Sequence, residues 1–275
     1  MLENEKLIRL ALEEDIGHGD LTTGSLIDRD RMAQAVILAK ESMVLAGLHM
    51  AQQVFIALDP AMSFESVFQD GAEIDKRDEI LMATGKLRAL LSGERTALNF
   101  LQRLSGIATL TRQYVNEVAG SNVRLTDTRK TIPGWRRLEK YAVKVGGAYN
   151  HRFGLYDGIL IKDNHIVAYG GISEAVARVR KSCPHLLRVE VEVSGLNQVK
   201  EALESGVDII MLDNMDLNEI KRAVNVIDGR ALIEVSGGIT RDTLAEIANT
   251  GVDIISVGAL THSARAVDIS MRVIV

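Results

Sequence analysis

The chain has 275 residues, of which 47% are hydrophobic, and a formal net charge of −5 at pH 7. This length allows one large domain or two modest ones with a real core, and the acidic balance argues against nucleic acid as a partner. The charged N-terminal segment, the lack of an apolar run of about 18 residues and the single Cys183 predict a cytoplasmic protein without a membrane span or intrachain disulfide.

The first hundred residues predict a mixed α and β domain. Apolar spacing favours helices at 7–15 and 49–58, an extended segment at 32–47, and strands at 62–68 and 78–85. A long helical stretch follows, which we expect Ser92 to cap, with a second helical stretch after Gly106. Arg95 would then lie in a first helical turn, where a cation opposes the helix dipole, and this weakly suggests that it serves an external anion.

From residue 123 onward, short apolar runs alternate with amphipathic helices. The expected strands are 123–127, 158–162, 188–193, 208–213, 231–236 and 253–258, and the last four begin 20 to 23 residues apart. This alternation predicts βαβ units and a parallel sheet. A complete eight-unit barrel needs about 250 residues, so we expect an incomplete, open α/β barrel of about six strands over residues 106–264. An N-terminal α/β sandwich domain is expected over residues 1–105, and the tail 265–275 is a candidate to pack on it.

Polar residues follow the predicted strands at the rim where parallel sheets bind ligands. Carboxylates in apolar strands are the sharpest signal: Glu190 and Glu192 share one face of their strand, and Asp213 ends the next one. Because a buried carboxylate is costly unless it is paired or metal-bound, we expect Glu192 and Asp213 to hold Mg²⁺, its waters or ribose hydroxyls. Strand-end lysine or glycine residues taken one at a time are usually solvated termini or turns.

A local excess of cations contrasts with the acidic chain. Residues 126–165 hold eight Lys/Arg against four Asp/Glu, a local charge of +4, which predicts a small anionic ligand. The candidate anion ligands are Arg129, Lys130, His151, Arg152 and Lys162. Arg136, Arg137, Lys140 and Lys144 are expected on the surface of a helix after Pro133. The glycine-containing ends of the last two strands, Ser236-Gly237-Gly238 and Gly258 with His262, fit a phosphate site.

Several long motifs together resemble one enzyme family. TDTRKTIPG, GGAYNHR, GLYDGILIKDNHI, VEVEV, MLDNM, EVSGGI and GVDIISVGALTHS, with EEDIGHGDLTT and LSGERTALNFLQRLSGIAT nearer the N-terminus, are similar to quinolinate phosphoribosyltransferase (nicotinate-nucleotide pyrophosphorylase, decarboxylating). The resemblance covers nearly the whole chain in order. GGAYNHR departs slightly from the family's GGG form but keeps His151 and Arg152.

The resemblance implies a reaction and a set of roles. Quinolinate and phosphoribosyl pyrophosphate would give nicotinate mononucleotide, pyrophosphate and CO₂ with Mg²⁺, in NAD biosynthesis. The enzyme would be a homodimer, or a higher oligomer, with Arg95 completing the partner's site. Lys130, Lys162, Glu192 and Asp213 would be catalytic. The substrate-binding set would comprise Arg95, Thr128, Arg129, Lys130, His151, Arg152, Lys162, Glu192, Asp213, Ser236, Gly237, Gly238, Ser256, Val257, Gly258 and His262.

Other functions stay open at this stage. They are a paralogue associated with molybdenum transport, a phosphoribosyltransferase for free nicotinate, a non-catalytic anion-binding protein, and a phosphate-handling lyase or isomerase. The intact IKDNH segment speaks against the first, and the joint presence of Glu192, Asp213 and the cations speaks against a binder. Release of CO₂ would distinguish the proposed reaction from that of a phosphoribosyltransferase for free nicotinate. Release of pyrophosphate would distinguish it from that of a lyase or isomerase.

Overall fold

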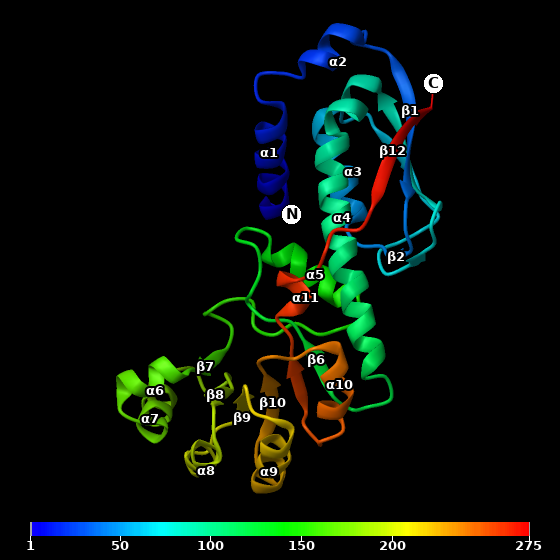
Figure 1. The fold of residues 1–275 in the computed structure, drawn as a ribbon. Helices are drawn as coiled ribbons and strands as arrows, with labels where there is room; N and C mark the ends of the chain where they lie inside the picture. Colours follow the sequence, from blue (N-terminus) through cyan, green and yellow to red (C-terminus); the bar gives the residue numbers. More distant parts are fainter. Residues whose placement is uncertain (1, 275) are drawn as a thin grey trace. The chain divides into compact units, whose positions relative to one another are not determined.

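A computed structural model of the chain describes residues 2–274, which divide into two compact units (Figure 1). The first unit takes residues up to 112 together with 133–146 and the segment from 264 onward. The second unit takes residues 113–132 and 147–263. The chain therefore passes between the units several times. The predicted combination of an α/β domain with an open parallel barrel is confirmed.

The first unit is built on a four-stranded antiparallel sheet. Its strand order is β12-β1-β5-β3, and a two-stranded pair, β2 with β4, lies beside it in the same unit. The strands are β1 (Met32–Ala39), β2 (Met43–Val44), β3 (Ser63–Glu65), β4 (Glu73–Ile74), β5 (Glu79–Lys86) and β12 (Ile269–Ile274). The C-terminal segment thus forms an edge strand against β1, with Ala35 opposite Val273.

Helices complete the first unit. They are α1 (Leu2–Ile16), α2 (Leu21–Leu26), α3 (Leu48–Leu58), α4 (Leu87–Glu117), whose last residues fall in the second unit, and α5 (Arg136–Val145). The core contains Ile37 of β1, Phe55 of α3 and Leu101 of α4, all fully buried. Burial of such side chains stabilises the unit by roughly 1.5–3 kcal/mol each.

The expected start of the long helix is wrong. Helix α4 begins at Leu87, so Ser92 lies inside it and does not cap it. The Ser92 hydroxyl instead donates a hydrogen bond to the Asp20 carboxylate at 2.9 Å. Arg95 is eight residues into the helix, where the macrodipole effect has faded, so the dipole argument for Arg95 fails. The helix also continues without a break through Gly106.

Gly106 allows the C-terminal segment to lie directly against α4. A Cβ atom at this position would come within 2.0 Å of the carbonyl oxygen of Arg265. We expect Gly106→Ala to lower the free energy of unfolding by about 1–3 kcal/mol, because this clash outweighs the gain of about 1 kcal/mol in helix propensity. Denaturant unfolding of Gly24→Ala supplies the control, since a Cβ at Gly24 of α2 meets nothing within 4 Å. Equal stabilisation by both substitutions would contradict this packing.

Helix α5 carries the basic segment after Pro133, and the expectation of a fully solvated surface is wrong for one residue. Lys140 is completely buried, as is its neighbour Glu139. Arg103 donates to the Glu139 carboxylate at 2.7 Å, which pairs the buried charge. Arg137 and Lys144 do lie exposed. A buried charge is tolerated only with such partners, and no local pattern in the sequence indicates which cation of this helix is buried.

The second unit is a six-stranded parallel sheet in the order β6-β11-β10-β9-β8-β7. The strands are β6 (Arg124–Thr126), β7 (Ile159–Ile161), β8 (Val189–Val193), β9 (Ile209–Asp213), β10 (Leu232–Ser236) and β11 (Ile254–Ser256), each inside its predicted range. The first strand, β6, pairs with the last one, β11, so the barrel is open between β6 and β7.

One extra segment lies beside β6 on this open side. Tyr149 makes an isolated parallel bridge with Thr126. Its N–H donates to Leu125 O at 2.8 Å, and its carbonyl accepts the Asp127 N–H at 3.1 Å. Residues 149–152 therefore take part of the place that a further barrel strand would fill.

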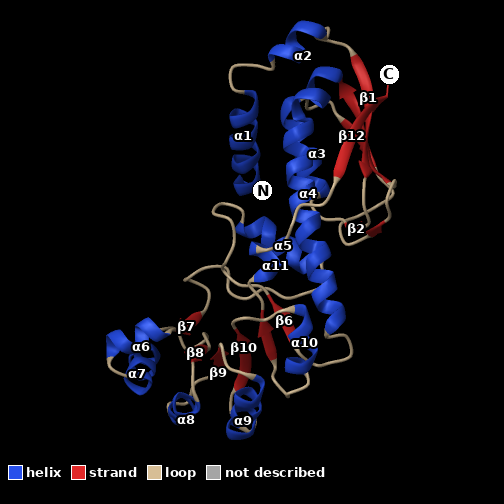
Figure 2. Cartoon of the chain, in the orientation of Figure 1, coloured by secondary structure: helices blue, strands red, loops and turns tan. Residues whose placement is uncertain are grey.

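The helices between the strands lie outside the curved row of strands (Figure 2). They are α6 (Asp163–Tyr169), α7 (Ile172–Ser182), α8 (Leu196–Glu204), α9 (Leu217–Ile227) and α10 (Arg241–Ala248), and the short helix α11 (Ala259–His262) follows the last strand of the sheet, β11. Within residues 2–274, none of the helices is both long and apolar enough to cross a bilayer.

Candidate active site

A cavity of about 590 Å³ opens at the carboxyl ends of the parallel strands. It lies entirely within the second unit, where all predicted site residues except Arg95 line it. These are Thr128, Arg129, Lys130, His151, Arg152, Lys162, Glu192, Asp213, Ser236, Gly237, Gly238, Ser256, Val257, Gly258 and His262. Arg95 is exposed on α4 of the first unit.

The loop after β6 carries the first two cations. The Lys130 N–H donates to Thr128 Oγ1 at 3.0 Å, and Lys130 O accepts the Thr261 hydroxyl at 2.7 Å. These bonds tie the loop to α11 on the far side of β11. The Lys130 side chain remains exposed. The backbone is thus fixed while the ammonium group is left to reach a ligand.

Arg152 enters the cavity from the segment beside β6. Its guanidinium donates to Gly158 O at 2.8 Å, and the preceding residue, His151, donates its N–H to Asp127 Oδ1 at 2.9 Å. Burial lowers the pKa of Arg152, and the nearby charge of Arg129 lowers it further. Because the positive charges of these two guanidinium groups repel each other in a half-buried site, binding of an anion between them is favoured.

The ends of β7, β8 and β9 combine a cation with two carboxylates. The Lys162 ammonium forms an ion pair with Glu192 Oε2. Glu192 lies opposite Met211 in the β8–β9 ladder, so Asp213 stands two residues further toward the rim. Asp213 Oδ2 accepts a hydrogen bond from the Asn214 side chain at 2.9 Å. The predicted proximity of these groups at one rim follows from the parallel strands.

Glycine turns form the opposite side of the cavity. Gly237 and Gly238 follow β10 with φ values of 89° and 63°, which favour glycine. A Cβ on Gly237 would also approach the Asn214 side chain to 2.3 Å. At Gly258, after β11, a Cβ would meet the Lys130 and His262 side chains at 3.0 and 3.1 Å. Backbone without side chains therefore faces the cavity here, as binding of a phosphate to N–H groups requires.

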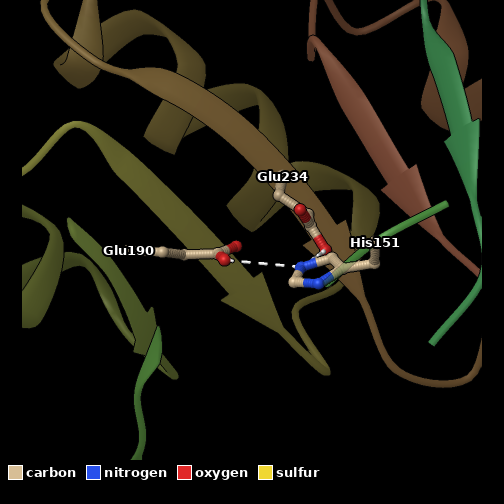
Figure 3. A group of neighbouring side chains, drawn as sticks. All are labelled: His151, Glu190 and Glu234. Carbon is tan, nitrogen blue, oxygen red and sulfur yellow. Dashed lines mark ion pairs between the residues drawn. The ribbon is translucent and has the colours of Figure 1, made fainter. Parts of the chain in front are cut away.

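Beneath the cations lies a buried cluster of His151, Glu190 and Glu234 (Figure 3). His151 Nε2 is 3.4 Å from Glu190 Oε2 and 3.5 Å from Glu234 Oε1. Burial opposes the imidazolium form, but the two carboxylates outweigh it and raise the pKa of His151 to about 10. Burial raises the pKa of Glu190 to about 7, against the opposing effect of His151.

Glu234 is a lining residue that the sequence analysis missed. The signal was available, because Glu234 is the lone carboxylate in the apolar strand 231–236, just as Glu192 is in its own strand. The other lining residues that were not predicted are Leu160, Met211, Asn214, Ile239, Thr240 and Ala259. They carry no charge, so a pattern of charges cannot single them out.

An open α/β barrel with cations and carboxylates on one side of its mouth and glycine turns on the other defines an enzyme that binds phosphorylated, anionic substrates. The comparison with known families is specific. Residues 20–105 match the quinolinate phosphoribosyl transferase N-terminal domain, and residues 107–272 match the C-terminal domain of the same family. The chain belongs to the quinolinate phosphoribosyltransferase family.

Individual relatives agree over the full length. The chain is 44% identical to a probable nicotinate-nucleotide pyrophosphorylase [carboxylating] of Bacillus subtilis, covering 99% of this chain and 94% of the relative. The crystal structure of NadC from Streptococcus pyogenes superposes with a TM-score of 0.94 at 45% identity, covering 97% and 94% of the two chains. The nicotinate-nucleotide pyrophosphorylase of Francisella tularensis superposes with a TM-score of 0.94 at 41% identity, covering 99% and 96%.

Proposed function

We propose that this chain transfers the phosphoribosyl group of phosphoribosyl pyrophosphate to quinolinate. The products are nicotinate mononucleotide, pyrophosphate and CO₂, the reaction of NAD biosynthesis that the names of its relatives imply. The observation that carries the proposal is one cavity in which two arginines, two lysines, three carboxylates and the glycine turns meet. Quinolinate and the phosphorylated donor bring many negative charges together, and this cavity offsets them.

On the cation side, Arg129 and Arg152 would bind the two adjacent carboxylates of quinolinate. Arginine suits this task because its planar fork matches a carboxylate. Lys162 would contribute a further charge once it exchanges its partner Glu192 for the substrate. His151 lies directly behind Arg152 in this clamp.

On the glycine side, the 5-phosphate would bind to the backbone of residues 236–238 and 256–258, with the His262 side chain at their edge. Lys130 lies next to Gly258 and would reach the pyrophosphate. Thr128 would complete the loop that holds it.

Glu192 and Asp213 fit a hydrated Mg²⁺. Both offer carboxylate oxygens to the cavity from neighbouring strands, and Mg²⁺ is held in proteins by one or two carboxylates together with waters and substrate phosphates. When bound, the ion would neutralise charge on the departing pyrophosphate. The same two carboxylates would hold the ribose hydroxyls and stabilise positive charge at the anomeric carbon, without a protein nucleophile.

Decarboxylation follows from the product of the transfer step. Once the ring nitrogen carries the ribosyl group it is cationic. Its positive charge then stabilises the electron pair of the broken C–C bond, which stays on the adjacent ring carbon when CO₂ leaves. The protein need only orient that carboxylate and exclude water from the transient carbanion, which then accepts a proton.

The proposal includes a cytoplasmic homodimer in which Arg95 completes the partner's site. Arg95 is an exposed cation on α4, and its side chain makes no hydrogen bond or ion pair with any of the described residues. An arginine without a partner on a regular helix is suited to bind an external anion.

The deciding experiment mixes the purified protein, Mg²⁺, phosphoribosyl pyrophosphate and carboxyl-labelled quinolinate, and follows CO₂ and pyrophosphate together. Equal release of both supports the proposal. Pyrophosphate release with nicotinate, but none with quinolinate, indicates the non-decarboxylating transferase. No turnover with either substrate contradicts the proposal and favours a binding protein.

Arg152→Ala is expected to raise the KM for quinolinate about 100-fold, because removal of one partner of a half-buried charge pair costs about 2–5 kcal/mol. The KM for phosphoribosyl pyrophosphate should change far less. Arg180→Ala is the matched control, since Arg180 pairs with Asp208 at the surface. A KM for quinolinate in Arg152→Ala equal to that of the control would remove Arg152 from the clamp.

A further inference from the structure

The His151 ring is held from both of its nitrogens. Nδ1 accepts the backbone N–H of Arg152 at 2.8 Å, so the proton of the ring lies on Nε2. Nε2 faces Glu190 and Glu234 at 3.4 and 3.5 Å (Figure 3). The two carboxylates stand on β8 and β10 and approach the ring from separate strands.

Packing alone does not fix this ring. A second cavity, of about 500 Å³, lies at the amino ends of the same strands, where Arg124, Ile209 and Ile254 line it. His151, Arg152 and Glu234 line both this cavity and the one at the carboxyl ends. With open space on two sides, the orientation of the ring depends on its polar contacts.

Burial restricts the two carboxylates to contacts with other groups of the protein. Glu190 is 5% exposed and Glu234 is 1% exposed. Neither Glu190 Oε1 nor Glu234 Oε1 makes a hydrogen bond, and the two carboxylates also face each other, so the His151 Nε2–H is the group that offsets their mutual repulsion. Buried carboxylates destabilise a fold unless they are paired. Two of them at one position therefore lower the stability of the fold, which argues against a purely structural role.

The contacts of Nδ1 disfavour a metal site in this cluster. A histidine that binds a metal through Nε2 carries its proton on Nδ1 and donates it to an acceptor. Here Nδ1 faces a donor, the Arg152 N–H. The Nε2 proton between two carboxylates accounts for the same three residues without an ion.

We propose that Glu190 and Glu234 are positioning residues for quinolinate binding: by holding His151 Nε2–H, they fix the ring and, through Nδ1, the backbone from which Arg152 reaches the cavity. Both carboxylates favour a proton on Nε2, while the Arg152 N–H that points at Nδ1 disfavours a second proton there, so the Nε2–H tautomer fits all three contacts. The inference rests on the proposed function through its ligand, quinolinate.

Calorimetric titration of quinolinate and of phosphoribosyl pyrophosphate, in separate experiments, tests the proposal. Glu234→Leu is expected to raise the Kd for quinolinate at least about tenfold and to leave the Kd for phosphoribosyl pyrophosphate within about twofold. Glu234→Gln keeps an acceptor of the same shape, so it should restore most of the affinity. Asp208→Asn is the matched control. Asp208 accepts the Val189 N–H at the amino end of β8, so its loss affects stability without touching His151.

Proton NMR keeps the test decisive if Glu234→Leu does not fold. The wild-type protein should show a downfield imidazole N–H signal, assigned by its loss in His151→Asn, that shifts upfield in Glu190→Gln and in Glu234→Gln. Three results would each overturn the proposal. The first is an imidazole N–H signal that does not move in either glutamine variant, and the second is an unchanged Kd for quinolinate in Glu234→Leu. The third is binding of one Zn²⁺ per chain that is lost in His151→Asn. Failure of the wild type to bind quinolinate would count against the proposed function, while the NMR signal would still decide the role of the carboxylates.

Discussion

Glu192→Gln is expected to lower kcat by about 10²- to 10³-fold, the usual effect of removing one electrostatic contact to a charge that develops in the transition state. Glu192 is 13% exposed in its side chain and faces the cavity from β8. Its negative charge would stabilise the anomeric carbon as pyrophosphate departs. The amide keeps the shape of the side chain but carries no charge, so the ground-state cavity should be preserved.

The same substitution should have the opposite effect on quinolinate binding. In the structure Lys162 is paired with Glu192, and that pair must separate before the lysine can meet a substrate carboxylate. Glu192→Gln releases the ammonium in advance, so the Kd for quinolinate should stay equal or fall. A loss of kcat without a loss of quinolinate affinity separates a role in the transition state from general damage to the site.

Steady-state kinetics combined with calorimetric titration provide the two readouts. Glu204→Gln is the control, because Glu204 is an exposed acid at the end of α8. If kcat in Glu192→Gln remained within about threefold of the control, Glu192 would have no part in the chemical step. If quinolinate binding were lost together with kcat, the Lys162–Glu192 pair would be a structural element of the site.

The parallel barrel was predictable from the sequence because its strands are buried on both faces. Each is a short run of apolar residues, and its carboxylates, such as Glu192 and Asp213, stand out against that background. Since parallel strands all end at the same rim, the polar residues that follow them had to converge. The cations after β6 and β7 line the cavity, as the ends of parallel strands predict without any long-range information.

The residues that local pattern could not place depend on tertiary pairing. His151 and Arg152 follow no predicted strand, and they reach the cavity because residues 149–152 bridge to β6 on the open side of the barrel. The pairing of β6 with β11, which creates that opening, links residues about 130 positions apart. The local excess of cations marked these two residues as candidate anion ligands, whereas periodicity could not place them at the site.

Two errors show where a local rule fails. The start of α4 was sought at Ser92 because serine favours N-caps, but β5 runs directly into the helix and Leu87 is its first residue. Lys140 was assigned to a solvated surface because lysine is rarely buried, yet α5 turns it fully inward. Burial of a charge is decided by what packs on the helix, and that information lies elsewhere in the chain.

Arg95→Ala and Arg152→Ala, each nearly inactive alone, are expected to restore activity when they are mixed as subunits. If Arg95 completes the partner's site, a hybrid dimer has one site that lacks both arginines and one site that lacks neither. Random reassociation at equal concentrations should therefore recover about a quarter of the wild-type activity. If Arg95 serves the site of its own chain, both sites of the hybrid carry a defect and nothing is recovered.

Co-expression of two differently tagged chains and purification by both tags in sequence isolate the hybrid, in which one of the two sites is intact. The coupled CO₂ assay should then give about half of the wild-type activity. A hybrid of Arg152→Ala with Glu192→Gln is the matched control, because both residues line the same barrel cavity and each site of that hybrid carries one defect. Activity in the first hybrid and none in the second would show that α4 of one subunit serves the barrel of another. Inactivity of both hybrids, with intact dimers by sedimentation, would show that Arg95 acts on the site of its own chain and would contradict its role in the partner's site.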